Sequence, residues 1–161
     1  MIKTSRISVL WLAAALFCVG LLTLGVAAQD RSDDTIFADF MASYDEAFNA
    51  KDLDKLATFY HPEVTIFEGG GINRGWTDYR DHHLGPELED FEDLKWGHTD
   101  VRATLLSAES AYVTAEYHLK AHYKERDIDV TGLATLVLVK KEGRWKIRHS
   151  HTSSRRAPAS Q

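Results

Sequence analysis

The sequence has little cysteine and lacks the short motifs of several large enzyme classes. Its single cysteine, Cys18, lies in an apolar N-terminal run, so the rest of the chain can form no disulfide bond. A Gly-rich phosphate-binding loop, a dinucleotide-binding fingerprint, a Cys-x-x-Cys pair and an internal repeat are all absent. These absences point to a globular domain that is stabilised by its own hydrophobic core.

An excess of basic charge is also missing. The chain has 19 Lys and Arg against 24 Asp and Glu, and its formal net charge is −5. Neutralisation of phosphate groups dominates nucleic-acid binding, so an acidic domain is a poor candidate for that function. The basic pair Arg155-Arg156 falls in a short polar segment, 155–161, that we expect to be a flexible tail. We therefore expect no nucleic-acid partner.

The N-terminus has the pattern of a signal peptide. Lys3 and Arg6 precede an uncharged, mostly apolar run from residue 7 to 26, and Val26-Ala27-Ala28 offers small residues for cleavage. This predicts a signal peptide at 1–28, a mature N-terminus at Gln29, and a periplasmic or secreted protein without membrane contact after cleavage. The run is near the ~17-residue lower limit of a spanning helix, so an uncleaved anchor is the alternative.

The mature chain has the length of one domain, which we place at 35–154 after a polar linker at 29–34. Asp33 or Asp34 can cap a first helix to about residue 50, and Asp52 can cap a second. A short strand at 64–68 ends at three glycines, and a third helix is expected at 76–84, before Gly85-Pro86. The first helix carries one apolar stripe, formed by Phe37, Phe40, Met41, Tyr44 and Phe48.

The second half of the chain has the pattern of β-strands, at 94–105, 111–123, 128–140 and 145–153. Residues 111–123 alternate apolar and polar side chains, which is typical of a strand with one buried face. Helices followed by a strand meander predict an α+β fold, in which a curved antiparallel sheet wraps around the N-terminal helices as a cone. The strand at 128–140 is apolar on both faces, with Leu133, Val137 and Val139 on one of them, which predicts a homodimer through the outer face of the sheet.

Three stretches of the mature chain, Tyr44–Asp54, Phe59–Ile66 and Leu136–His151, resemble a known family in order and spacing. The resemblance is to the nuclear transport factor 2-like superfamily, in its SnoaL-like and ketosteroid isomerase-like branch. It implies the cystatin-like cone fold described above. This superfamily hosts isomerases, cyclases, dehydratases, binding proteins and assembly domains, so the fold alone does not give the function.

The ketosteroid isomerase resemblance implies a first set of catalytic candidates. The oxyanion-stabilising tyrosine of those enzymes corresponds to Tyr44, and their general-base carboxylate corresponds to Glu68. Their late-strand carboxylic acid corresponds to Thr135, whose hydroxyl is a weaker donor; loss of one such donor typically costs about 10²–10³ in rate. The alternative is that Tyr44 belongs to the apolar stripe and Glu68 caps the glycine turn.

A second set of candidates is a group of histidines. Trp145 and Ile147 define the inner face of the last strand, and the period of two places His149 and His151 on that face as well. By the same reasoning, we expect His83 on the third helix and His98 on the strand at 94–105 in one cavity, with Glu68 or Glu87 at its edge. The alternatives are a metal site and a network of neutral, hydrogen-bonded histidines.

Aromatic side chains complete the expected pocket, because an apolar cavity with a few polar groups is the usual small-molecule site. We expect ligand contacts from Trp76, Tyr79, Trp96, His98, Tyr117 and Thr135. The leading hypothesis is a domain that binds a small, partly apolar molecule, with acid–base chemistry by Tyr44, Glu68, His83, His149 or His151. We assign no cofactor and no metal ion, and a metal-binding domain and a non-catalytic assembly module are the alternatives.

Overall fold

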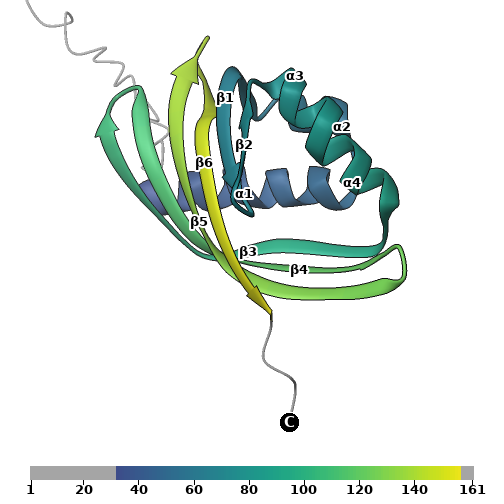
Figure 1. The fold of residues 1–161 in the computed structure, drawn as a ribbon. Helices are drawn as coiled ribbons and strands as arrows, with labels where there is room; N and C mark the ends of the chain where they lie inside the picture. Colours follow the sequence, from purple (N-terminus) through teal and green to yellow (C-terminus); the bar gives the residue numbers. More distant parts are fainter. Residues whose placement is uncertain (1–31, 157–161) are drawn as a thin grey trace, which may run out of the picture. The chain divides into compact units, whose positions relative to one another are not determined.

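The computed structural model describes residues 32–156, which form one α+β unit (Figure 1). The expected signal peptide at 1–28, the beginning of the linker and the end of the tail lie outside the described residues. The folded part is longer than the expected 35–154, because the first helix begins at Asp33 and the last strand ends at Arg156. In the part of the chain that the structure describes, no helix is long and apolar enough to cross a membrane.

The first two helices confirm the expected apolar stripe and one of the expected caps. Helix α1 (Asp33–Asn49) is capped by Ser32, whose side chain accepts a hydrogen bond from the Thr35 amide, rather than by Asp33 or Asp34. Helix α2 (Leu53–Ala57) follows Asp52, whose carboxylate accepts from the Lys55 amide at 2.8 Å. The buried face of α1 consists of Phe37, Met41, Tyr44, Ala47 and Phe48.

The third helical segment continues past the expected stop at Gly85-Pro86. It consists of α3 (Trp76–Tyr79), a π-helical turn η1 (Arg80–Leu84) and α4 (Gly85–Asp90). In the π turn, the Gly85 amide donates to the Arg80 carbonyl, and a Cβ at residue 85 would lie only 2.5 Å from that oxygen. The glycine therefore allows the wider turn, and the proline, which has no N–H, follows it as the first turn of α4 begins.

The sheet has six strands in the order β2-β1-β6-β5-β4-β3. The expectation of an entirely antiparallel sheet is wrong at one pair, because β1 and β6 run parallel, with Phe67 opposite His151. The C-terminal strand inserts between β1 and β5, and its direction is set by its antiparallel partner β5. Strand β2, which begins at the last of the three glycines, was not expected. The strands are β1 (Tyr60–Glu68), β2 (Gly71–Arg74), β3 (Phe91–Ser107), β4 (Ser110–Tyr123), β5 (Arg126–Lys141) and β6 (Arg144–Arg156).

The long strands β3, β4 and β5 curve strongly, and the helices lie on the concave side of the sheet (Figure 1). The alternation in β4 is confirmed, since its odd-numbered residues from Ala111 to Tyr117 are buried and the even-numbered ones are exposed. The Tyr117 ring packs against the opposite residue of β5, Gly132. A Cβ at residue 132 would lie 2.5 Å from two atoms of that ring and 2.1 Å from the Ser153 carbonyl oxygen.

The close approach at Gly132 yields a prediction about stability. Gly132→Ala forces the Tyr117 ring or the β6 backbone to move, and overpacking of this kind typically costs about 1–3 kcal/mol. We expect urea unfolding to show a lower midpoint for this variant. The matched control is Gly97→Ala in β3, where a Cβ meets no atom within 4 Å and stability should be unchanged or slightly higher. Equal stability of the two variants would contradict the close packing.

Candidate active site

A cavity of about 50 Å³ lies between the helices and the concave face of the sheet. Since about 10–15 Å³ accommodates one water, it has room for a few small atoms, and aromatic rings fill most of the space around it. Its apolar walls include Phe48, Phe91 and Leu136. The polar side chains that line it come from α1, β1, the third helical segment, β3 and β6; they are Tyr44, Tyr60, Glu68, Tyr79, Glu87, Trp96, His98, Ser150 and Thr152.

The buried imidazole of His98 is held by a carboxylate of α1. Nδ1 of His98 donates to one oxygen of Asp45 at 2.7 Å, and the His98 amide donates to the other oxygen at 2.8 Å. Only 4 % of the His98 side chain is exposed. Among the described residues, Nε2 of this ring has no hydrogen-bond partner. A neutral imidazole with Nδ1–H fixed in this way presents Nε2 as a proton acceptor.

Three tyrosines meet at the same cavity. The hydroxyls of Tyr44 and Tyr60 share a hydrogen bond of 2.8 Å, and the ring of Tyr79 contacts that of Tyr60 edge to face at 5.8 Å. Burial raises the pKa of all three phenols. The phenols consequently stay protonated at neutral pH. The Tyr79 hydroxyl donates to Glu68, and one of Tyr44 and Tyr60 donates to the other, so one phenol of that pair keeps a donor for a ligand oxygen.

Glu68 lies at the end of β1, where its carboxylate accepts a hydrogen bond of 3.4 Å from the Tyr79 hydroxyl. Burial raises the pKa of Glu68, and the nearby His83 opposes this by favouring the charged form. Burial has the larger of the two opposing effects, so this carboxyl group binds its proton more tightly than an exposed glutamate does. The structure therefore brings Glu68 to the cavity that also contains Tyr44, as the family resemblance implied.

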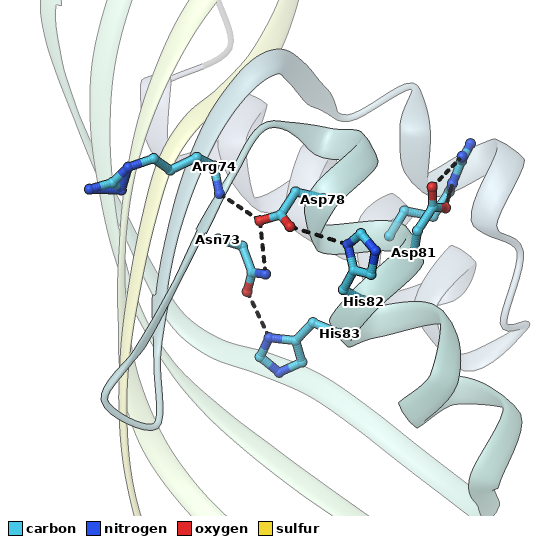
Figure 2. A network of polar contacts seen from close by, with 7 residues as sticks. Asn73, Arg74, Asp78, Asp81, His82 and His83 are labelled. Carbon is cyan, nitrogen blue, oxygen red and sulfur yellow. Dashed lines mark hydrogen bonds and ion pairs between the residues drawn. The ribbon is translucent and has the colours of Figure 1, made fainter.

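His83 lies beside the cavity and belongs to a polar network that joins η1 to β2 (Figure 2). Its Nδ1 donates to the side-chain oxygen of Asn73 at 2.8 Å, and Asn73 in turn donates to Asp78. On the other side of the ring, Nε2 lies 3.5 Å from Glu87 and 3.9 Å from Glu68. The hydrogen bond to Glu87 raises the pKa of His83, although partial burial opposes the shift.

The expectation that His149 and His151 face the cavity is wrong. A bulge interrupts the pairing of β5 with β6, since Leu138 pairs with Ile147 and the next residue, Val137, pairs with His149. The extra residue shifts the side-chain phase of β6 by one position. Ser150 and Thr152 therefore line the cavity, and both imidazoles pack on the ring of Phe67 on the outer face of the sheet, with centroid distances of 5.0 and 5.9 Å.

Of the six residues expected to contact a ligand, three line the cavity and three do not. Tyr79, Trp96 and His98 line the cavity. Thr135 does not: it is exposed on the outer face and pairs with His151, because the buried positions of β5 are the even-numbered residues. Trp76 stacks on Tyr60 at 4.7 Å and Tyr117 contacts Trp96 at 5.0 Å, so both support cavity residues without lining the cavity.

The four histidines consequently do not converge, and the metal-site alternative loses its geometric basis. His83 and His98 lie at or beside the cavity, whereas His149 and His151 lie on the opposite face. Among residues 32–156, the structure shows no group of three or more His, Cys, Asp or Glu side chains that could hold a metal ion.

Sequence reasoning missed Asp45, Tyr60 and Asn73. Asp45 follows a core residue of α1, and a charged residue at such a position usually faces solvent. Its role in the site is apparent only from its hydrogen bond to His98 on β3. Tyr60 lies before the strand that was expected at 64–68, whereas β1 begins at this residue. The adjacent pair Tyr44-Asp45 was the available signal, because a phenol and a carboxylate in sequence on one helix can serve two sides of a single site.

Comparisons with known proteins agree with this fold. The sequence model of the SnoaL-like domain matches residues 38–157. A candidate ketosteroid isomerase from Shewanella frigidimarina is similar in structure, with 28% identity and a TM-score of 0.63 over 71% of this chain and 92% of that one. A comparison with curated protein sequences found no match.

Two more distant structures share the fold. A nuclear transport factor 2-like superfamily protein from Salmonella enterica has 17% identity and a TM-score of 0.69, over 79% of this chain and 93% of that one. A type 2 hexachlorocyclohexane dehydrochlorinase has 15% identity and a TM-score of 0.63, over 74% and 84% of the two chains.

The environment of His83 yields a prediction about its protonation. The folded protein should bind the His83 proton more tightly than the unfolded chain, whose histidine pKa is near 6.5. The stabilisation is therefore complete below pH 6.5 and is lost as pH rises through the higher folded pKa. In an NMR titration, we expect Glu87→Gln to lower the pKa of His83. His61 is the internal control, because burial and the nearby Lys141 lower its pKa and Glu87→Gln should leave it unchanged.

Proposed function

We propose that this chain, which belongs to the SnoaL-like domain family of the nuclear transport factor 2-like superfamily, binds a small, partly apolar molecule and catalyses proton transfer at one of its carbon atoms. The observation that carries this proposal is the His98–Asp45 pair, buried beside the same cavity as Glu68 and the three tyrosines. Burial raises the pKa of Glu68 and of the three tyrosines, and titratable groups perturbed in this way are typical of acid–base sites.

Each group has a chemical role in this scheme. His98, held by Asp45 through Nδ1, removes a proton from a carbon next to a carbonyl group. The protonated phenol of Tyr44, which is hydrogen-bonded to Tyr60, donates to the oxygen on which negative charge develops. Glu68, whose pKa is raised by burial, returns a proton to a second position. The product is an isomer of the substrate, and the two transfers leave His98 protonated and Glu68 ionised. A proton therefore passes from His98 to Glu68 through solvent before the next turnover.

The alternatives explain less of the structure. An assembly module needs no buried carboxyl or imidazole at its centre, and such groups cost stability when they are removed from water. The small cavity does restrict the substrate, because only its reacting end fits the present volume of about 50 Å³. Support also comes from the similar structures, whose names include an isomerase and a dehydrochlorinase.

Two further proposals rest on the sequence. The charged and apolar pattern of residues 1–28 supports export to the periplasm or the medium. A homodimer through the outer face of the sheet is supported by the apolar side chains of β5 there, of which Leu133 is 61% exposed. A second copy of the chain would remove this surface from water.

Catalysis can be tested without knowledge of the natural substrate. If the site removes protons next to a carbonyl group, the protein in D₂O should introduce deuterium into members of a panel of small neutral ketones, as measured by NMR. We expect His98→Gln to lower the rate by about 10²–10⁴, the usual contribution of a general base. The matched control is His122→Gln, because His122 also donates to an aspartate, Asp127 at 2.8 Å, but lies on the surface.

Two results would contradict catalysis of this kind. In one, the wild-type protein exchanges no ketone of the panel faster than buffer does. In the other, His98→Gln retains the full rate, which would remove the imidazole from the mechanism.

The dimer yields a separate prediction. Multi-angle light scattering at micromolar concentration should give twice the mass of one chain, and Leu133→Glu should reduce it to one chain by placing a charge in the apolar contact. Leu106→Glu is the matched control, since Leu106 is also 61% exposed but lies near the end of β3 rather than on β5. A monomeric wild-type protein would contradict the proposal.

A further inference from the structure

The imidazoles of His149 and His151 share the outer face of the sheet and have no polar partners there. Both pack edge to face on the ring of Phe67, with interplanar angles of 87° and 71°. Neither ring makes a hydrogen bond or an ion pair with any described residue. His149 is half-buried and His151 is exposed. Since a neutral imidazole has one acceptor nitrogen, the pair offers two unused acceptor atoms on this face.

Two histidines in a His-x-His pair on a strand can bind one metal ion. Residues two positions apart project from the same face, about 7 Å apart along the strand. The rings of His149 and His151 already contact one phenyl ring, so they lie within reach of a common ion. A structural zinc ion takes four ligands, however, and among residues 32–156 no further His, Cys, Asp or Glu completes a group of three. One chain therefore supplies only half of a zinc site.

The pair lies in the middle of an apolar patch of the outer face. On one side, Phe67 pairs with Ile72 of β2, which is 53% exposed. On the other side, Val137 of β5 pairs with Tyr112 of β4, which is 39% exposed. Phe67 and Val137 themselves pair with the two histidines of β6, and paired residues share one face of a sheet. The patch continues to Leu133, the residue at the centre of the proposed dimer test.

This central position determines what the pair meets in a dimer. A homodimer usually has a twofold axis, and residues at the centre of such a contact lie beside the axis, opposite their own copies. Burial of four imidazoles without polar partners costs free energy, and a ligand that all four share removes that cost. A cation suits this position, because the free imidazole nitrogens are acceptors and the net charge of the chain is −5.

We propose that His149 and His151 of two copies together bind one divalent transition-metal ion of the zinc class across the twofold axis. Four imidazole nitrogens form the closed, four-coordinate shell of a structural zinc site, so the ion stabilises the dimer and takes no part in catalysis. The site is distinct from the cavity, which lies on the other face of the sheet. This inference rests on the proposed dimer and is independent of the proposed proton transfer.

Zinc titration of the metal-free protein tests the site. We expect calorimetry to give one zinc ion for every two chains. In analytical ultracentrifugation, the dissociation constant of the dimer should fall at least about tenfold when zinc replaces EDTA, because an ion that binds only the dimer stabilises it. Cobalt(II) is the spectroscopic probe, since a four-coordinate imidazole site gives it a strong visible absorption that the hydrated ion lacks.

Two variants separate metal binding from a structural role of the histidines. His151→Gln removes two of the four ligands, and it should weaken zinc binding by more than about 100-fold, the upper range for loss of a mere outer-shell partner, and abolish the cobalt absorption. The matched control is His118→Gln combined with His122→Gln on β4. These two surface imidazoles are each paired with an aspartate, and their loss should leave zinc affinity and cobalt absorption unchanged.

The outcomes distinguish failure of the site from failure of the dimer. A protein that is dimeric in EDTA but binds no zinc, or binds one ion per chain, overturns the site and retains the dimer. Unchanged zinc affinity in a His151→Gln protein with the circular dichroism of the wild type also overturns the site. A protein that stays monomeric with and without zinc overturns both the site and the proposed dimer.

Discussion

The site depends on how helix α1 satisfies the backbone of the edge strand β3. An edge strand presents amide groups without a partner strand, and three of those in β3 donate to side chains of α1. The amides of Trp96, His98 and Ala103 bond Asn49, Asp45 and Asp34, each at 2.8 Å. These bonds fix the helix along the strand. The α1 side chains that accept from the backbone amides of this edge strand therefore also position the indole of Trp96 and the imidazole of His98 at the cavity.

The same arrangement explains why titratable groups are tolerated in this core. Asp45 uses one oxygen for the His98 amide and the other for its ring, so a single carboxylate satisfies both. The phenols of Tyr44 and Tyr60 satisfy each other, and raised pKa values keep them neutral. The buried polar groups are therefore mostly neutral or paired, which lowers the cost of removing them from water.

Much of the fold could be predicted from sequence, because periodicity reports which side of an element is buried. The stripe of α1 and the alternation of β4 were both correct. Periodicity fails where the backbone itself changes register. The π turn at Gly85 and the bulge after Ile147 each insert one residue. Gly85-Pro86 marks the first but was interpreted as the end of a helix, and no glycine or proline between 144 and 152 marks the second. Asp45 escaped prediction for another reason, since its partner is 53 residues away.

The bulge in β6 also decides which chemistry the cavity can perform. Without it, the period of two would place His149 and His151 on the face of β6 that lines the cavity, where imidazoles are usual metal ligands. With it, the hydroxyls of Ser150 and Thr152 take those positions, and the two imidazoles pack on the outer face. A single imidazole held by a carboxylate then remains among hydrogen-bond donors. That combination suits transfer of a proton next to a polarised oxygen better than it suits coordination of a cation.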